Sequence, residues 1–128
     1  TSDSGWDTEK EQDFLRDILN DLRAAGIRTS LFIDADVRMA EFAAKAGADR
    51  VELYTGPYAH MYATSPEKAI EPFLETAKRV KQLGIGLNAG HDLSLENLKV
   101  FYFFVSLFFF GKLIKTQLKI LVKLFAYT

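Results

Sequence analysis

The sequence predicts an α/β chain that forms part of a parallel TIM (β/α)8 barrel, with about three to four βα units. Short segments rich in β-branched and aromatic residues alternate with longer segments whose apolar residues recur at helical spacing. This alternation is typical of a parallel sheet with right-handed crossovers. A complete barrel needs about 250 residues, whereas the chain has 128. We therefore expect a partial barrel.

The predicted strands are aliphatic on one face only. The strands are expected over residues 27–33, 50–55 and 85–88. An open doubly wound sheet, with helices on both faces, would be aliphatic on both. The barrel is therefore favoured, since its strands send alternate side chains inward and outward. The aliphatic set is Leu31, Ile33, Val51, Leu53, Ile85 and Leu87, and the opposite set is Ser30, Phe32, Asp34, Glu52, Tyr54, Gly86 and Asn88.

The predicted helices have recognisable starts and stops. A first helix is expected over residues 7–25, with a capping box of Thr8 and Glu11 at its start. A second is expected over residues 37–46, with Asp34 and Asp36 capping it. A third runs from Ser65 to about residue 83, a fourth begins near residues 94–97, and residues 56–57 are expected to break the chain. The first three helices are expected to end at glycines, namely Gly26, Gly47 and Gly84.

Composition excludes several classes of protein. The chain contains no cysteine, so disulfide frameworks and thiolate metal sites are excluded. A net charge of −1 gives no basic face for nucleic acid. No Asp or Glu follows Glu96, however, so the chain has two compositions. We divide it into a partial barrel domain, residues 1–100, and an aberrant apolar and basic tail, residues 101–128.

The tail allows two interpretations. Its apolar run over residues 100–110 is shorter than the ~20 residues that span a bilayer. Lysines at helical spacing then predict a basic amphipathic helix lying on an anionic membrane. The favoured interpretation is out-of-frame translation, because a composition rich in Phe, Lys, Leu and Ile and without Asp or Glu is typical of A/T-rich codons in a shifted frame. No membrane partner is expected under this interpretation. The lysines are Lys112, Lys115, Lys119 and Lys123.

Candidate site residues follow the ends of the predicted strands, where barrel enzymes place their catalytic groups. Glu52 is a carboxylate facing the barrel interior, so it is either ion-paired there or functional. His91 has the side chain best suited to proton transfer near neutrality, although many loop histidines are only satisfied polar residues. The backbone amides of residues 90–92 could receive a phosphate oxygen. Asp34, Thr55 and Asn88 complete the candidates, His60 is expected on the surface, and no metal-ligand spacing or nucleotide-binding loop is found.

Four stretches resemble the pyridoxine 5′-phosphate synthase family in order and spacing, over residues 1 to about 99. They are residues 1–7, 25–34, 47–59 and 87–98, with the sequences TSDSGWD, AGIRTSLFID, GADRVELYTGPYA and LNAGHDLSLENL. The resemblance implies a transferase of vitamin B6 biosynthesis that condenses 3-amino-2-oxopropyl phosphate with 1-deoxy-D-xylulose 5-phosphate. It also implies a cytoplasmic homo-oligomer that acts on small phosphorylated substrates without a metal or organic cofactor.

The resemblance assigns roles residue by residue. His91 matches the family's proton donor, and Glu52 matches the strand carboxylate that stabilises the transition state. Thr1 matches a loop threonine that contacts the pentulose phosphate. Asp92 matches a position, often Gly in the family, whose backbone contacts the aminoketone phosphate.

Two departures from the family shape the expectation for this chain. The family's first four strands, with further catalytic residues, would precede Thr1, and its Gly-His-Ala strand does not follow Leu98. We therefore expect a fragment that is inactive and poorly soluble alone, because half a barrel exposes sheet edges and apolar surface. Two alternatives stay open: another phosphate-binding barrel enzyme, or a non-catalytic membrane-associating fragment.

Overall fold

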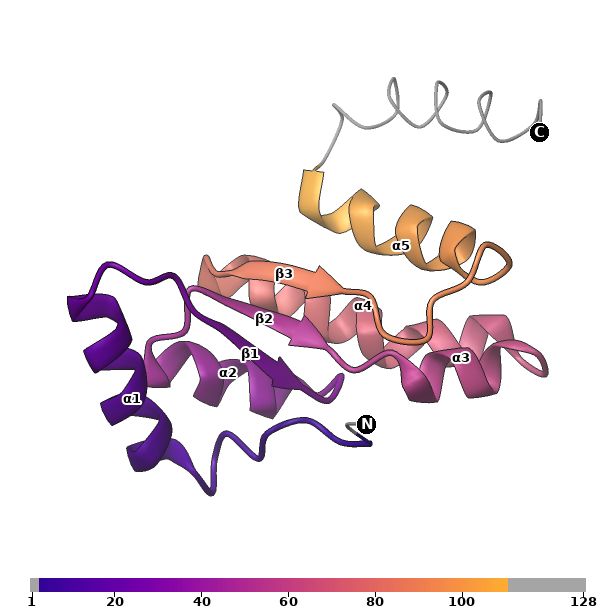
Figure 1. Ribbon diagram of the computed structural model, residues 1–128. Helices are drawn as coiled ribbons and strands as arrows, with labels where there is room; N and C mark the ends of the chain where they lie inside the picture. Colours follow the sequence, from indigo (N-terminus) through magenta and orange to yellow (C-terminus); the bar gives the residue numbers. More distant parts are fainter. Residues whose placement is uncertain (1–2, 111–128) are drawn as a thin grey trace.

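The computed structural model describes residues 3–110, and the side chains of residues 3–106. Within that range, three parallel strands lie in sequential order: β1 (Ser30–Ile33), β2 (Arg50–Leu53) and β3 (Gly86–Ala89) (Figure 1). Neighbouring strands are joined by helical crossovers, which is the arrangement of a barrel wall and confirms the predicted partial barrel. The helices are α1 (Gln12–Ala24), α2 (Val37–Ala46), α3 (Gly56–Tyr62), α4 (Pro66–Leu83) and α5 (Leu98–Phe110).

The two faces of the sheet differ as predicted. The aliphatic face of β1 and β2 is buried, and α2 and α4 lie behind the sheet in Figure 1. Ile33, Val51 and Leu53 are fully buried there, and Leu31 is 6% exposed. The opposite face, which we call the inner face, carries half-buried Phe32 and other polar or aromatic side chains. Burying the aliphatic face holds the strands in register, because a one-residue slip would exchange the two faces.

The predicted start of α1 is wrong. The helix begins at Gln12, and Glu11 occupies the N-cap without a side-chain hydrogen bond. Thr8 does not cap it, because the Thr8 hydroxyl is buried and donates instead to the carbonyl of Met39 at 2.7 Å. The Thr8 hydroxyl therefore makes a tertiary hydrogen bond in place of the capping-box hydrogen bond. The predicted stop is correct, since Gly26 adopts a φ of 75° after the last turn.

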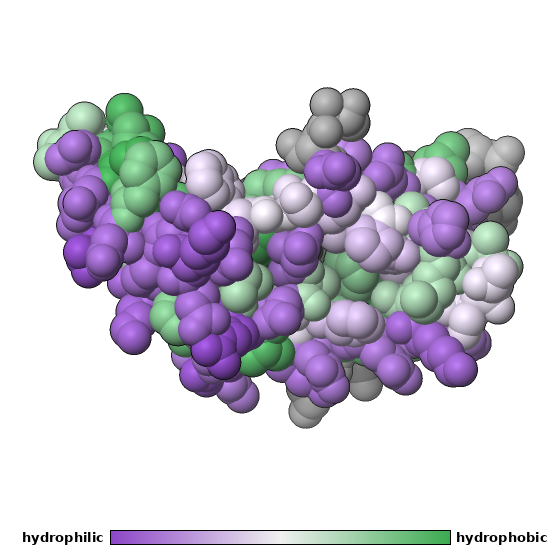
Figure 2. All heavy atoms as spheres, turned by 90° about the horizontal axis from the view of Figure 1, so that it is seen from below, coloured by the Kyte–Doolittle hydropathy of each residue, from purple (hydrophilic) through white to green (hydrophobic). Residues whose placement is uncertain are grey.

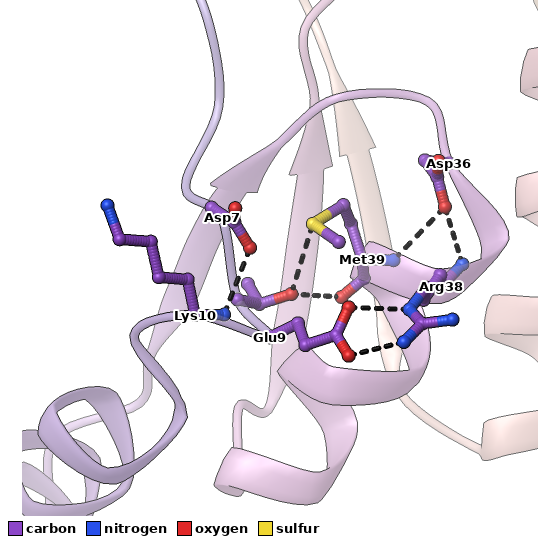
Figure 3. Close-up of polar contacts among 7 residues, drawn as sticks. Asp7, Glu9, Lys10, Asp36, Arg38 and Met39 are labelled. Atoms are coloured by element: carbon purple, nitrogen blue, oxygen red, sulfur yellow. Dashed lines mark hydrogen bonds and ion pairs between the residues drawn. The ribbon is translucent and has the colours of Figure 1, made fainter.

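An ion pair between Glu9 and Arg38 joins the segment before α1 to the start of α2 (Figure 3). The Arg38 guanidinium binds both carboxylate oxygens of Glu9, which lowers the pKa of Glu9 and raises that of Arg38. Asp36 caps α2 as predicted, accepting from the amides of Arg38 at 2.6 Å and Met39 at 3.3 Å. The ion pair joins residues that are 29 apart in the sequence and helps to position the segment before α1 against α2.

Asp34 does not cap α2, contrary to the prediction. Its carboxylate accepts from the amide of Gly5 at 2.9 Å. The next amide, of Trp6, donates to the carbonyl of Phe32 at 2.8 Å. The chain passes so close to β1 that a Cβ on Gly5 would lie 2.3 Å from the Cα of Ile33. Glycine is therefore required at position 5, and the segment runs along the edge of β1.

Residues 56–57 were predicted to break the chain. In the structure they begin α3 instead. Pro57 lies in its first turn, where a missing N–H costs no hydrogen bond. The reason for the helix is tertiary, because it buries the ring of Tyr58 completely. That ring packs edge-on against Phe73 at 5.8 Å and Phe101 at 5.1 Å between ring centroids. His60 lies exposed on this helix.

α4 and α5 pack together over the remaining side of the core. α4 ends at Leu83, and Gly84 closes it as predicted, with a φ of 73°. α5 begins at Leu98 and buries Phe101 against Phe73, so the packed helix continues past residue 100. Within residues 3–110, no helix is both long and apolar enough to cross a bilayer. The basic helix predicted around residues 112–123 lies outside the described residues.

Apolar side chains remain uncovered at the end of the molecule formed by α1 and the turn after it (Figure 2). Trp6 is 45% exposed, Phe14 52% and Ile27 51%. The first two rings tilt toward each other at 6.2 Å and line an apolar groove between α1 and β1. The groove lies beside β1, the strand at one edge of the described sheet.

Candidate active site

Glu52 lies at the centre of the inner face. In the parallel ladder it stands opposite Phe32 on one neighbouring strand and Asn88 on the other. Its side chain is half-buried, and within residues 3–106 the Glu52 carboxylate has no hydrogen-bond or ion-pair partner. The interior ion pair considered as the alternative is therefore not formed in this part of the chain. The carboxylate is available to a ligand.

A second charged group, Arg50, lies one layer below on the same face. Its Nη1 donates to Oδ1 of Asn88 at 3.1 Å. Gly86, opposite Arg50 in register, makes room for it, because a Cβ there would lie 3.0 Å from both Cβ and Nη2 of Arg50. Nε of Arg50 is buried without a partner in the described chain. Such a buried donor costs about 1–3 kcal/mol, so stability alone does not explain the arginine.

His91 follows β3 and turns over the carboxyl ends of the strands. Its ring lies 5.5 Å from that of Tyr54 and 6.3 Å from that of Phe32. These two rings flank Glu52, one along β2 and one across the ladder. Nδ1 of His91 lies 2.8 Å from Oδ2 of Asp92, and a carboxylate can only accept there. Nδ1 therefore carries a proton, and Nε2 is the nitrogen available for proton exchange with a ligand.

The loop that carries His91 is held from β2 and α3. The buried hydroxyl of Thr55 donates to the carbonyl of His91. The buried hydroxyl of Tyr58 donates to the carbonyl of Asn97 at 2.7 Å, and burial raises the pKa of Tyr58 to about 12. Asn97 in turn closes a capping box with Ser94, at 2.8 and 3.4 Å. The loop is thus rigidly connected to the strand bearing Glu52.

Asp92 adopts a left-handed backbone conformation, with a φ of 60°. Glycine enters this region without strain, whereas Asp does so more readily than most other residues. The side-chain amide of Asn97 donates to the Asp92 carbonyl at 3.3 Å and stabilises the turn. α5 begins only at Leu98, so the amides of residues 90–92 lie outside its first turn. The phosphate contact predicted there draws no support from a helix terminus.

The structure brings together some of the predicted residues and not others. Glu52 and Asn88 are paired in the ladder on the inner face, and His91 packs against Tyr54 and Phe32, the two rings that flank Glu52. Thr1 lies outside the described residues. Thr55 is buried and supports the loop, so its role is structural. Arg50 was missed, although its alternation with Glu52 along the strand was the available signal.

The assembled groups are suited to acid–base chemistry. A free carboxylate and an oriented imidazole share one face, beside an amide whose orientation is set by an arginine. Within the described residues, no three His, Asp or Glu side chains group closely enough to hold a metal ion. The carboxylate and the imidazole fit a reaction that transfers protons and stabilises developing charge.

Comparison with known proteins shows to which family the chain belongs. A family model described as "Pyridoxal phosphate biosynthesis protein PdxJ" matches residues 1–107. A protein of Bacteroides thetaiotaomicron named pyridoxine 5′-phosphate synthase is 62% identical over 102 residues, 80% of this chain and 43% of the relative. Proteins with the same name from Cytophaga hutchinsonii (54% over 98 residues; 77% of this chain, 41% of the relative) and Flavobacterium johnsoniae (46% over 101; 79% and 43%) are also similar. The chain spans less than half the length of these relatives, and it belongs to the PdxJ family.

Proposed function

We propose that this chain provides the Glu52 and His91 half of a pyridoxine 5′-phosphate synthase active site. The reaction condenses 3-amino-2-oxopropyl phosphate with 1-deoxy-D-xylulose 5-phosphate to pyridoxine 5′-phosphate in vitamin B6 biosynthesis. The observation that carries the proposal is that the imidazole of His91 packs on Phe32 and Tyr54, the rings that flank the free carboxylate of Glu52, in a chain of this family. A cytoplasmic homo-oligomer is part of the same proposal.

His91 acts as the proton donor. With Nδ1 donating to Asp92, the ring acts as an acid in its imidazolium form: Nε2–H passes its proton to a leaving oxygen, and the neutral ring protonated at Nδ1 remains. Glu52 stabilises positive charge that develops on the substrate nitrogen during ring closure, since an unpaired carboxylate in a half-buried site interacts strongly with charge. Thr1 and the backbone of Asp92 contact the two substrate phosphates.

We also infer that the tail departs from the family. The boundary predicted at residue 100 falls inside α5. Buried side chains of that helix are described as far as Ser106, and the family match extends to residue 107. A boundary near residue 107 is therefore favoured over one at 100. Sequencing the gene tests the out-of-frame origin: a Gly-His-Ala strand encoded one base out of register supports it, and an intact in-frame tail refutes it.

A chimera tests the catalytic proposal. The matched 102-residue region of the Bacteroides thetaiotaomicron relative is replaced by the corresponding part of this chain, and the relative supplies the rest of the barrel. The chimera is expected to form pyridoxine 5′-phosphate from both substrates, whereas the chain alone forms none. His91→Asn and Glu52→Gln should each lower kcat by roughly 100-fold or more, the usual contribution of a general acid or charge stabiliser.

The matched control is His60→Asn, because His60 is an exposed histidine on α3 away from the inner face. It should leave kcat unchanged. Wild-type kcat in the His91→Asn chimera would refute the assigned role of that residue. An inactive wild-type chimera that is folded would refute the proposed function of the segment.

A further inference from the structure

The inner face carries a basic side chain, Arg50, to which the proposed reaction gives no role. Three observations set it apart. Its Nη1 donates to Oδ1 of Asn88, its Nε is a buried donor without a partner in the described residues, and Gly86 leaves space for the guanidinium to cross to β3. A Met at position 50 would fill the same space without burying an unsatisfied donor.

The contact determines how the Asn88 amide is oriented. An arginine has only donors, so the atom of Asn88 that faces it must be the carbonyl oxygen Oδ1. The Nδ2 amino group then points away from Arg50. Without the arginine, the two ends of the amide are nearly equivalent in shape and either could face the site.

Asn88 stands directly opposite Glu52 in the parallel ladder, and both side chains belong to the inner face. Within residues 3–106, Nδ2 of Asn88 donates to no protein acceptor. The amide therefore presents free N–H donors next to the free carboxylate. A ligand that places an amine or developing cation at Glu52 meets a hydrogen-bond donor beside it.

We propose that Arg50 is a positioning residue that locks the amide of Asn88, so that Nδ2 donates to a carbonyl or hydroxyl oxygen of the ligand bound at Glu52. This inference rests on the proposed function for the identity of the ligand, though not for the locked amide itself. Asn88 contacts the ligand and Arg50 acts only through Asn88. The acceptor is a neutral oxygen, because an additional anion would lie too close to Glu52.

Nuclear magnetic resonance on the chimera, whose complete barrel covers the surfaces that make the chain alone poorly soluble, tests the locked amide. The Asn88 side-chain signal is identified by its loss in Asn88→Asp. In the wild type we expect an ordered amide, with a heteronuclear NOE well above that of Asn20, an exposed asparagine on α1 that serves as the reference. In Arg50→Met the NOE should fall to the Asn20 value, and Arg50→Lys, which restores a cationic donor, should recover part of it.

Gly86→Ala provides a second route to the same contact. The added methyl would lie 3.0 Å from Nη2 of Arg50, so the guanidinium must move while the arginine itself is kept. The Asn88 amide should become mobile as in Arg50→Met. An Asn88 amide that stays as ordered in both variants as in the wild type overturns the proposal, as does a mobile amide in the wild type.

The chimera supplies the functional readout. Arg50→Met is expected to lower kcat/KM about tenfold, the effect of one misplaced hydrogen bond, with partial recovery in Arg50→Lys. An unchanged kcat/KM overturns the ligand contact. An inactive wild-type chimera whose Asn88 amide is ordered and depends on Arg50 refutes the proposed function but leaves the locked amide standing, so the two failures are distinguishable.

Discussion

Replacing Tyr58 by Phe isolates the hydrogen bond that anchors the site loop. The Tyr58 hydroxyl and the Asn97 carbonyl lie 2.7 Å apart, and both residues are buried. A net hydrogen bond of this kind contributes about 0.5–1.5 kcal/mol. The carbonyl keeps a longer bond from the amide of Phe101, at 3.3 Å, which limits the penalty of leaving it unpaired. We therefore expect Tyr58→Phe to lower the free energy of unfolding by about 1 kcal/mol at pH 7.

The same substitution changes the dependence of stability on pH. Burial raises the pKa of Tyr58 from 10.0 to about 12 in the folded chain. Because the folded value lies above the unfolded one, the contribution is complete below pH 10 and is lost as the pH rises toward 12. Tyr58→Phe cannot ionise there, so its free energy of unfolding should fall less steeply above pH 10.

Urea denaturation at several pH values between 7 and 11 measures both effects, with the m-value as the check that the unfolding transition is the same. Tyr62→Phe is the matched control, because the Tyr62 hydroxyl donates to the Glu96 carbonyl at 3.1 Å in an exposed position. It should change stability less. If Tyr58→Phe is as stable as the wild type at pH 7, or loses stability equally steeply in base, the anchoring role is refuted.

Three further predictions concern the elements that support the sheet. Asp36→Ala removes the cap that accepts from two amides and should cost about 1 kcal/mol by urea denaturation, whereas no loss would show that α2 begins without it. Gly47→Ala forces an L-residue to a φ of 97° and should cost roughly 1–2 kcal/mol, and an unchanged melting temperature would contradict this strain. Hydrogen bonds from the backbone and side chain of Thr29 lower the pKa of Asp49 below its usual value of 3.8. The contribution of the Asp49 carboxylate to folding stability is therefore complete above pH 3.8, and it is lost as the pH falls through the pKa of the folded state. Acid unfolding of Asp49→Asn should be less steep over that interval, and an identical slope would exclude a stabilising role for the carboxylate.

The helix boundaries show which local signals were sufficient. Asp36 and Gly47 bound α2 as expected, because a carboxylate cap and a left-handed glycine act on amides within a few residues. The capping box at Thr8 failed, because Met39, far along the chain, offered its hydroxyl a buried acceptor. α3 was missed because the residues before Tyr58 read as a turn until the tertiary packing of that ring is known.

The site divides in the same way. Glu52 and His91 were predicted as site residues from strand alternation and from residue chemistry, which depend only on local sequence. The contact between Arg50 and Asn88 was not predicted. It joins residues that are 38 apart, and it depends on the register of two strands and on the space left by Gly86. Which nitrogen of His91 is free also depended on its contact with Asp92.

Local sequence patterns were therefore sufficient to predict the barrel wall, the inward face of each strand and the two residues of the proposed chemistry. These follow from the period-two alternation of strands, from caps and from side-chain type, all of which act over short distances along the chain. Three features follow only from tertiary contacts: the orientation of the Asn88 amide, the anchoring of the His91 loop by Tyr58 and the path of the segment before α1. Each of these rests on hydrogen bonds between residues that only the packing of helices on the sheet brings within reach.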